Sequence, residues 1–570
     1  MATVVESRRV DLRLKNELLK SEQCNGKEAN GKINSHKNGY VNSTKSSNGL
    51  HKEAAGAGAG DGGAGGAGGC SAPGMEWSRY DTFAGSFEKC SLLTAVLTHI
   101  GLYILMLLGF VNQLLFTPKV ATERNREGYA PLYNPFEQFY SRYVYRRVRH
   151  CFNRPISSAP GALLTLKERH TDDYNWTFRF TGTERVCINL GSYNYLGFVE
   201  AGRGAATAAC ARACGLALGS PRAELGSTAL HLQLEEATAS FLGVEAAIVF
   251  GMGFATNALG LPGLLGPDVL ALSDENNHAS LILGLRLARA CVRVFRHNDL
   301  RHLERLARAA LAERRWRKIV IVVEGVYSME GSIVPLRAVV ALKKRLGLQL
   351  YLDEAHSVGA LGARGRGVTE HAGVAPGDVD VLMGTFTKSF GAAGGYIAGS
   401  RRLVRWVRAH GHATAYAHSM APPVAQQVLA AMRALATPAG RARVRALRDN
   451  THYFRTRLKQ MGVVTFGHDD SPVVPMLVYT FSKMAATVER LTARGVATVG
   501  VGFPATPLNK ARIRFCLSAA HTRAQLEHCV AAIEAVADEL GLRYSRRALP
   551  APPAPHPPHP HPPAEEPLHE

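Results

Sequence analysis

Three apolar runs in the middle of the chain each end in polar side chains that could do chemistry. Glu324 follows KIVIVV, Asp353 follows LQLYL, and Thr385–Lys388 follows VDVLMG. Short apolar runs of this kind are typical of the buried strands of a parallel sheet. Ligands bind at the carboxyl ends of such strands, so we expect these residues to meet in one pocket.

The surroundings of Lys388 suit an aldehyde cofactor that carries a phosphate. The lysine lies in GTFTKSFG, where its amine could form an imine while Thr385 and Thr387 bind a phosphate. The carboxylate of Asp353 would keep a pyridine nitrogen protonated and make the ring an electron sink. His278, in SDENNHAS, offers a flat ring to stack on the cofactor. A single lysine is usually a solvated charge and a single histidine usually structural, but together these residues indicate pyridoxal phosphate (PLP).

A nucleic-acid motor is the first alternative. Residues 352–357 read LDEAHS, like a helicase Walker B box, and the net charge is +21. That chemistry needs a G-x-x-x-x-G-K-[ST] loop to hold the phosphates, and the chain contains neither Gly-Lys-Ser nor Gly-Lys-Thr. We therefore exclude it and predict no nucleic-acid partner. The positive charge is left to an Arg-rich surface, an anionic membrane or anionic substrates.

No metal site is predicted from residue spacing. The ten cysteines form no Cys-x-x-Cys pair and no ordered His/Cys pattern, so we expect reduced thiols in a cytosol-facing protein. Residues 546–570 form a Pro/His-rich tail that cannot build a core. The histidines of this tail could bind metal only adventitiously.

The elements that position the chemistry lie between about residue 160 and residue 545. Apolar runs alternate there with helical stretches, which predicts an α/β fold with a mostly parallel sheet. Residues 1–85 are rich in Asn, Ser, Lys and Gly and are expected to be disordered, without a cleavable signal peptide.

One segment before the α/β region is long and apolar. Ser91–Thr117 contains no Asp, Glu, Lys or Arg, and about 20 apolar residues span a bilayer. We predict a transmembrane or membrane-embedded helix at 86–117, with a buried or interfacial helix as the alternative. More Lys and Arg follow this segment than precede it, which places its C-terminal side in the cytosol. The aromatic and basic stretch 136–149, in a membrane-proximal linker at 118–160, either lies along the membrane or packs on the enzyme.

Seven ordered motifs resemble the α-oxoamine synthase family of fold-type-I PLP enzymes, which condense an amino acid with an acyl-CoA and lose CO2. The motifs are YNYLG (193–197), GMGFATN (251–257), SDENNHAS (273–280), EGVYSMEG (324–331), YLDEAHSVGALGARGRG (351–367), GTFTKSFGAAGGY (384–396) and RIRFCLSAAHT (512–522). Within the family, YNWTFRFTG (174–182), GFPATP (502–507) and the apolar segment resemble the lysine-bearing subunits of eukaryotic serine palmitoyltransferases, of the subunit 3 or subunit 2 type. The resemblance implies a PLP-binding large domain at 161–450 and a smaller C-terminal α+β domain at 451–545.

The resemblance also implies a role for each site residue. Lys388 would hold PLP and act as acid and base at the substrate α-carbon, Asp353 would pair with the pyridinium, and His278 would stack on the ring. The remaining cofactor contacts would come from His356 with Ser328 at the phenolic oxygen, from Gly253, Phe254, Thr385 and Thr387 at the phosphate, and from Ser419 at the phosphate of a partner's site. Arg514 would bind the substrate carboxylate, because its guanidinium suits bidentate contact. Asn194 would assist it, and Arg512 is the less favoured candidate.

The implied reaction joins L-serine to palmitoyl-CoA and yields 3-ketosphinganine, the first step of sphingolipid synthesis. The implied setting is the endoplasmic reticulum membrane, with the catalytic domain facing the cytosol. The implied partners are a lysine-lacking subunit in a heterodimer and small activating and regulatory membrane subunits. Two alternatives remain at this point: a family member that uses glycine, and a non-catalytic scaffold subunit, against which the presence of Lys388 argues.

Overall fold

The computed structural model describes Glu88, residues 92–115, Gly128, and residues 139–200, 204–503 and 505–547. The segments predicted to be disordered, 1–85 and nearly all of 546–570, lie outside the described residues, as does most of 116–138.

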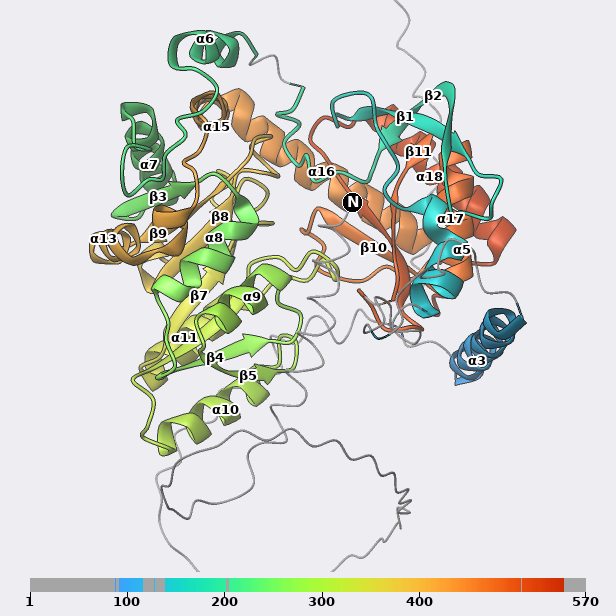
Figure 1. The fold of residues 1–570 in the computed structure, drawn as a ribbon, viewed down its shortest axis with the longest axis horizontal. Helices are drawn as coiled ribbons and strands as arrows, with labels where there is room; N and C mark the ends of the chain where they lie inside the picture. Colours follow the sequence, from blue (N-terminus) through green and yellow to red (C-terminus); the bar gives the residue numbers. More distant parts are fainter. Residues whose placement is uncertain are drawn as a thin grey trace, which may run out of the picture. The chain divides into compact units, whose positions relative to one another are not determined.

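A seven-stranded sheet forms the centre of the enzyme region (Figure 1). Its order is β3-β9-β8-β7-β6-β4-β5, and the strands are β3 (Ala246–Phe250), β4 (Val269–Asp274), β5 (Cys291–Phe295), β6 (Lys318–Glu324), β7 (Gln349–Asp353), β8 (Val381–Thr385) and β9 (Gly395–Gly399). The strands from β8 to β5 pair in parallel, and β9 alone runs antiparallel, to both of its neighbours. The predicted α/β class with a mostly parallel sheet is confirmed.

The strands that carry the predicted site residues are buried along nearly their whole length. Every residue of β6, β7 and β8 except the first is buried, as expected for strands covered on both faces. The register places Glu324 opposite Asp353, and Asp353 opposite Met383. The carboxyl ends of β6, β7 and β8 therefore lie side by side.

Helices precede, separate and follow the strands of this sheet. They are α7 (Ala229–Leu242), α8 (Gly253–Gly260), α9 (Ala279–Leu287), α10 (Leu300–Ala312), α11 (Leu336–Leu346), α12 (Val368–Ala372), α13 (Arg401–His410), α14 (His412–Tyr416) and α15 (Pro422–Ala436). Helices α8 and α9 approach closely, since a Cβ at Gly284 of α9 would lie 2.6 Å from the carbonyl oxygen of Asn257. A larger residue at position 284 would force these two site-bearing helices apart.

The C-terminal part contains two small sheets and three longer helices. One sheet has the order β10 (Val473–Tyr479), β13 (Ala511–Cys516), β12 (Val499–Val501), and the other has the order β1 (Leu163–His170), β2 (Arg179–Asn189), β11 (Val496–Ala497). The helices are α16 (Pro438–Gln460), α17 (Phe481–Ala493) and α18 (Arg523–Leu540). The hairpin β1–β2 thus pairs with β11, more than 300 residues later in sequence, and joins the C-terminal strands. The proposed domain boundaries stay predictions.

Helix α3 (Leu92–Leu115) corresponds to the apolar segment. Its 24 residues are long and apolar enough to cross a membrane, and only 6% of the window Ala95–Asn112 is buried. At 1.5 Å per residue the helix is roughly 36 Å long, which exceeds the hydrocarbon core of about 30 Å. Near its C-terminal end, Phe110 stacks on Phe139 with ring centroids 4.4 Å apart.

The basic stretch after α3 packs on the enzyme in the part that is described. It forms a π-helix (Tyr140–Tyr145), α5 (Arg146–Val148) and a 3-10 turn (Arg149–Cys151). The guanidinium of Arg146 lies 4.5 Å from the ring of Trp176, and Arg149 donates to the carbonyl oxygen of Trp176 at 2.5 Å. These two arginines therefore fix the loop between β1 and β2.

Candidate active site

Lys388 lies in the loop that joins β8 to β9. Its Nζ is 3.4 Å from Thr385 Oγ1 at the end of β8, and 6.0 Å from the ring centroid of Tyr193. Burial lowers the pKa of Lys388, while the carboxyl groups of Asp353 and Glu324 act in the opposite direction. A lysine amine with a lowered pKa is available as nucleophile and base nearer neutral pH.

Asp353 is buried at the end of β7 and held by two donors. Asn257 Nδ2 donates to its Oδ2 at 2.7 Å, and the backbone N–H of Ala355 donates to its Oδ1 at 2.8 Å. Asn257 is in turn fixed by the hydroxyl of Tyr351, which donates to Asn257 Oδ1 at 2.8 Å. The sequence analysis did not identify Asn257, although it ends the GMGFATN motif.

His356 lies one turn beyond Asp353 and is buried. Its Nδ1 is 2.8 Å from the hydroxyl of Tyr195, and its ring meets Tyr193 edge-on at a centroid distance of 4.8 Å. Burial, with the charges of Lys388 and Arg514, holds the pKa of His356 well below its ordinary value. The imidazole is therefore neutral at physiological pH. Both tyrosines belong to the YNYLG motif, but no individual role had been assigned to them.

His278 caps the start of α9. Its Nδ1 is 2.7 Å from Ser280 Oγ, and its ring lies 6.0 Å from the ring of Phe254. Its backbone N–H donates to the carboxyl of Glu324, whose pKa is raised well above the ordinary value by burial and by Asp353. Glu324 therefore orients the backbone that carries the His278 ring. Ser328 is placed at Tyr193, to which it hydrogen-bonds, and Tyr193 in turn meets the ring of His356.

The start of α8 provides backbone donors for a phosphate. Gly253 and Phe254 are the first residues of this helix, and its N-cap residue has no capping side chain. The first N–H groups of a helix lack intrahelical partners and attract anions. A Cβ at Gly253 would lie 3.0 Å from Thr385 Cγ2 and 3.3 Å from the carbonyl oxygen of Gly394, so only glycine fits easily between them. Thr385 is buried, whereas Thr387 is exposed.

Ser419 lies in a segment that runs beside the start of α8. A Cβ at Gly251 would be 3.5 Å from the carbonyl oxygen of His418. The Oγ of Ser419 is buried and has no hydrogen-bond partner among the described residues. A hydroxyl and helix amides for a phosphate, a carboxylate for a pyridinium and a lysine amine for an aldehyde form a donor set that fits PLP.

Arg514 and Arg512 point to the same side of β13, but their environments differ. The guanidinium of Arg514 lies 4.6 Å from the ring of Tyr193, and its buried Nε has no hydrogen-bond partner among the described residues. Arg512 donates to the carbonyl oxygen of Met329 at 2.9 Å and forms an ion pair with Glu330 at 3.4 Å. Of the two arginines, Arg514 is thus the better candidate to donate hydrogen bonds to a substrate carboxylate.

Asn194 is the second predicted substrate residue. Its Nδ2 donates to the carbonyl oxygen of Pro160 at 3.4 Å, and its buried Oδ1 has no partner in the described part of the chain. The Ser518 hydroxyl donates to the Asn194 backbone carbonyl at 2.6 Å, which joins this segment to the strand end after Arg514.

Comparison with known proteins agrees with this geometry. Residues 185–533 match the family model of class I and II aminotransferases. The chain is 46% identical to serine palmitoyltransferase 3 of Homo sapiens over 552 residues, covering 93% of this chain and 97% of the relative. It is 44% identical to serine palmitoyltransferase 2 of Caenorhabditis elegans, covering 81% and 86%.

A solved structure of SPT (serine palmitoyltransferase) with the PLP internal aldimine superposes with a TM-score of 0.62 at 28% identity, covering 69% of this chain and 94% of that one. The predicted resemblance and fold are confirmed, and the cofactor is PLP. The chain belongs to the serine palmitoyltransferase family of PLP-dependent transferases.

Proposed function

We propose that this chain is the catalytic, lysine-bearing subunit of a serine palmitoyltransferase. It condenses L-serine with a long-chain acyl-CoA, releases CO2 and CoA, and forms 3-ketosphinganine. The observation that carries this proposal is the position of Lys388, in reach of Thr385 and beside the Tyr193 ring over which Arg514 lies. The names of the relatives support the choice of substrates.

Five groups of the chain hold PLP in this proposal. Lys388 would hold its aldehyde, Asp353 would pair with its pyridine nitrogen, and His278 would stack on its ring. His356 bonds the phenolic oxygen, with Ser328 acting through Tyr193. The phosphate is bound by Gly253, Phe254, Thr385, Thr387 and Ser419. PLP supplies an electron sink for the negative charge that develops on the substrate α-carbon.

Arg514 and Lys388 carry out substrate binding and proton transfer in this proposal. The Arg514 guanidinium binds the carboxylate of serine, assisted by Asn194, and so orients the Cα–H bond toward Lys388. The freed Lys388 amine then removes the α-proton, which a lysine with a pKa lowered by burial can do near neutral pH. Both groups lie against the Tyr193 ring, with Lys388 Nζ 6.0 Å and the Arg514 guanidinium 4.6 Å from its centroid.

Helix α3 serves as the membrane anchor in this proposal. Long acyl chains partition into bilayers with about 0.8 kcal/mol per buried methylene. An anchor therefore keeps the active site close to both the acyl donor and the product. Because basic residues follow the helix, we place the enzyme region on the cytosolic side of the endoplasmic reticulum membrane.

The partner is a lysine-lacking subunit, joined by small activating and regulatory membrane subunits. Relatives of this chain are named as subunit types 2 and 3, which agrees with a multi-subunit enzyme. Met252, which precedes α8, and Leu225 and Tyr416 are large apolar side chains that are all exposed. An exposed apolar surface of this kind, close to the residues proposed to bind the phosphate, supports a subunit interface there. Ser419 lies in the same region, and we expect it to contact the cofactor phosphate in the site of the partner subunit.

Substitution of Lys388 tests the proposal. The chain is co-expressed in microsomes with its lysine-lacking partner, and labelled serine or labelled glycine is supplied with a series of acyl-CoAs. Wild type is expected to form 3-ketosphinganine from serine, whereas Lys388→Ala and the charge-matched Lys388→Arg form none. Product from either variant would overturn the assignment of Lys388, and consumption of glycine alone would overturn the substrate.

Protease protection tests the topology. In sealed microsomes, the region 160–545 is expected to be digested by protease added from outside, with a lumenal marker protein protected as the control. Full protection of this region would place the catalytic domain in the lumen and contradict the proposal.

A further inference from the structure

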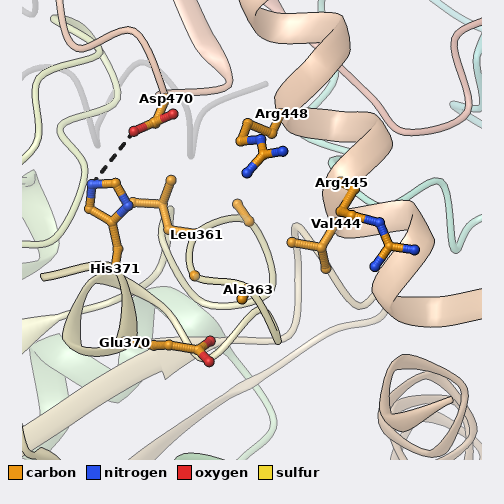
Figure 2. Close-up of a pocket in the computed structure, with 10 residues that line it drawn as sticks. Leu361, Ala363, Glu370, His371, Val444, Arg445, Arg448 and Asp470 are labelled. Atoms are coloured by element: carbon orange, nitrogen blue, oxygen red, sulfur yellow. Dashed lines mark ion pairs between the residues drawn. The ribbon is translucent and has the colours of Figure 1, made fainter. Parts of the chain in front are cut away.

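Two histidines and an aspartate from distant parts of the sequence meet outside the PLP site. His371 lies in α12, whereas His468 and Asp470 lie in the loop before β10. Asp470 Oδ2 is 3.8 Å from His371 Nε2 and 3.8 Å from His468 Nδ1. Each residue offers one ligand atom, and these atoms all lie within 4.8 Å of one another. Figure 2 shows the ring of His371 turned toward the Asp470 carboxylate.

A buried arginine of α16 stabilises the loop that carries His468 and Asp470. Arg455 of α16 donates to the carbonyl oxygens of Phe466, Ser471 and Val473 at 2.7, 3.3 and 3.0 Å. These three bonds flank the two ligands on both sides. The His468 backbone N–H also donates to the carbonyl oxygen of Gly331 at 2.9 Å. The loop is therefore fixed before any ligand binds, which lowers the entropy cost of binding.

The helix that carries His371, the third ligand, is capped by the buried carboxyl group of Glu354. Glu354 accepts from the backbone N–H groups of Val368 at 2.8 Å and Thr369 at 3.4 Å, and so caps the helix that carries His371. Glu354 directly follows Asp353, so α12 is tied to the end of β7. His371 thus has a rigid support on the side of the large sheet.

A third histidine, His452, contacts the carboxylate of Asp470. His452 Nε2 is 2.7 Å from Asp470 Oδ1, the carboxylate oxygen that lies away from the contact with His371. Metal-binding carboxylates are commonly oriented in this way by an outer hydrogen-bond partner. His468 Nδ1 accepts a hydrogen bond from the Asp470 backbone N–H at 3.1 Å, which orients this imidazole beside the carboxylate.

The cavity beside these residues distinguishes between classes of metal. It has a volume of about 270 Å³, and it is lined by His371 and Asp470 and, on the helix α16 across from them, by Arg445 and Arg448 (Figure 2). Two guanidinium groups repel any divalent cation, so an ion bound here must gain its affinity from the ligand types, and a single carboxylate is a poor site for Ca²⁺ or Mg²⁺, which need several oxygen ligands. Two imidazoles and one carboxylate instead suit Zn²⁺, with the fourth position open to water from the cavity.

We propose that His371, His468 and Asp470 form a Zn²⁺ site, with His452 as the outer partner of the carboxylate. A tetrahedral zinc ion with bonds of about 2 Å needs ligand atoms roughly 3.3 Å apart, so the side chains close by about 1 Å on binding. The ion joins α12, on the side of the large sheet, to the loop before β10 in the C-terminal part. None of the residues assigned to PLP or serine lines the cavity. The site is therefore separate from the active site.

Zinc binding to the full chain tests this proposal directly. The assembled, PLP-loaded complex is purified without a histidine tag, and His556, His559 and His561 of the tail are replaced by serine to remove background binding. The metal-stripped protein is then titrated with Zn²⁺ against a chromophoric chelator. We expect one zinc ion per chain at this site, and at least a tenfold loss of affinity in His371→Ala, His468→Ala and Asp470→Asn.

The matched control is His410→Ala, because His410 is an exposed histidine stacked on Trp406, 3.8 Å between ring centroids, away from the cluster. Its zinc affinity is expected to equal that of the parent. Melting temperatures without metal show that the variants fold, and X-ray absorption at the zinc edge is expected to show two imidazoles in the parent. A parent that binds no zinc, or affinities unchanged in all three ligand variants, would overturn the site whether or not the chain proves to be a serine palmitoyltransferase.

Discussion

Asn257 donates a hydrogen bond from its Nδ2 to Oδ2 of Asp353 at 2.7 Å, across 96 residues of sequence. Tyr351 donates to the other end of the same amide at 2.8 Å. One side chain therefore links the middle of β7 to its catalytic end through α8. The bond uses one lone pair of the carboxylate and leaves the other oxygen to the Ala355 N–H and the cofactor. Asn257 is a positioning residue for Asp353.

Replacing Asn257 is expected to weaken the hold of Asp353 on the cofactor. Asn257→Ala removes one hydrogen bond to a charged group, which costs about 1.5–3 kcal/mol and lowers kcat/KM at least tenfold. Asn257→Asp is expected to be worse, because two carboxyl groups in contact share a proton and reduce the negative charge on Asp353. The measurements are kcat/KM and the visible absorbance of the bound PLP as a function of pH.

Tyr351→Phe is the matched control, since it removes only the bond to the amide and leaves Asn257 next to Asp353. Its absorbance and its pH dependence are expected to stay close to wild type. If Asn257→Ala also leaves the absorbance and its pH dependence unchanged, Asn257 has only a structural role.

Arg514 and Arg512 are expected to fail in different ways. Arg514→Ala removes charge-assisted contacts to the serine carboxylate, so kcat/KM for serine should fall about 10- to 100-fold, mainly through KM. Arg512→Ala instead loses its bonds to Met329 and Glu330 and should lower the melting temperature, with a smaller change in the KM for serine. Serine titrations and thermal melts of both variants separate the two. An unchanged KM in Arg514→Ala would move the carboxylate site elsewhere.

Glu324 is expected to tolerate replacement by glutamine, which keeps a hydrogen-bond acceptor, but not replacement by alanine, which removes it. Burial and the neighbouring Asp353 raise its pKa well above the ordinary value, which favours the neutral carboxyl. Glu324→Gln keeps an oxygen for the His278 N–H and should retain activity within about threefold, whereas Glu324→Ala leaves a buried donor unpaired at about 1–3 kcal/mol. The kcat/KM and the melting temperature of both variants are compared. Equal losses in both would mean that the ionised carboxylate is needed.

The sequence predicted the residues that a simple rule of sheet geometry brings together. Glu324, Asp353 and Thr385 end three adjacent parallel strands, so the alternation of strands and helices was enough to place them at one edge. Lys388 follows the last of these strands and came with them. These predictions needed only element order and the direction of the strands.

Contacts between distant segments could not be predicted in this way. Tyr195 and His356 are 161 residues apart, and their hydrogen bond depends on how the segment after β2 folds over the large sheet. His371 and Asp470 have no metal-ligand spacing in sequence, because they meet only when α12 and the loop before β10 come together. Side chains that join separately folded parts carry no local pattern.

The C-terminal part predicts a pH dependence of stability. His521 is buried, with its Nδ1 accepting from the Ser518 N–H at 3.1 Å and its Nε2 donating to the Asn189 carbonyl at 3.0 Å. Burial lowers its pKa from 6.5 to about 4, against a smaller opposite effect of the bond to Asn189. Because the folded pKa is lower than the unfolded one, the unfolded state takes up a proton first as the pH falls. Stability is therefore complete above pH 6.5 and decreases by about 3 kcal/mol between pH 6.5 and 4.

His521→Asn is expected to flatten this part of the curve, since the amide cannot titrate and its oxygen can still accept from Ser518. Melting temperatures of the assembled complex are measured from pH 7 to pH 4 in the variant and in wild type. His528→Asn is the control, because His528 is exposed and its Nε2 donates to the carbonyl oxygen of Arg494 at 2.9 Å. The control should keep the wild-type slope, because its exposed side chain is not part of the buried network around His521. An identical slope in His521→Asn would mean that other groups cause the loss of stability in acid.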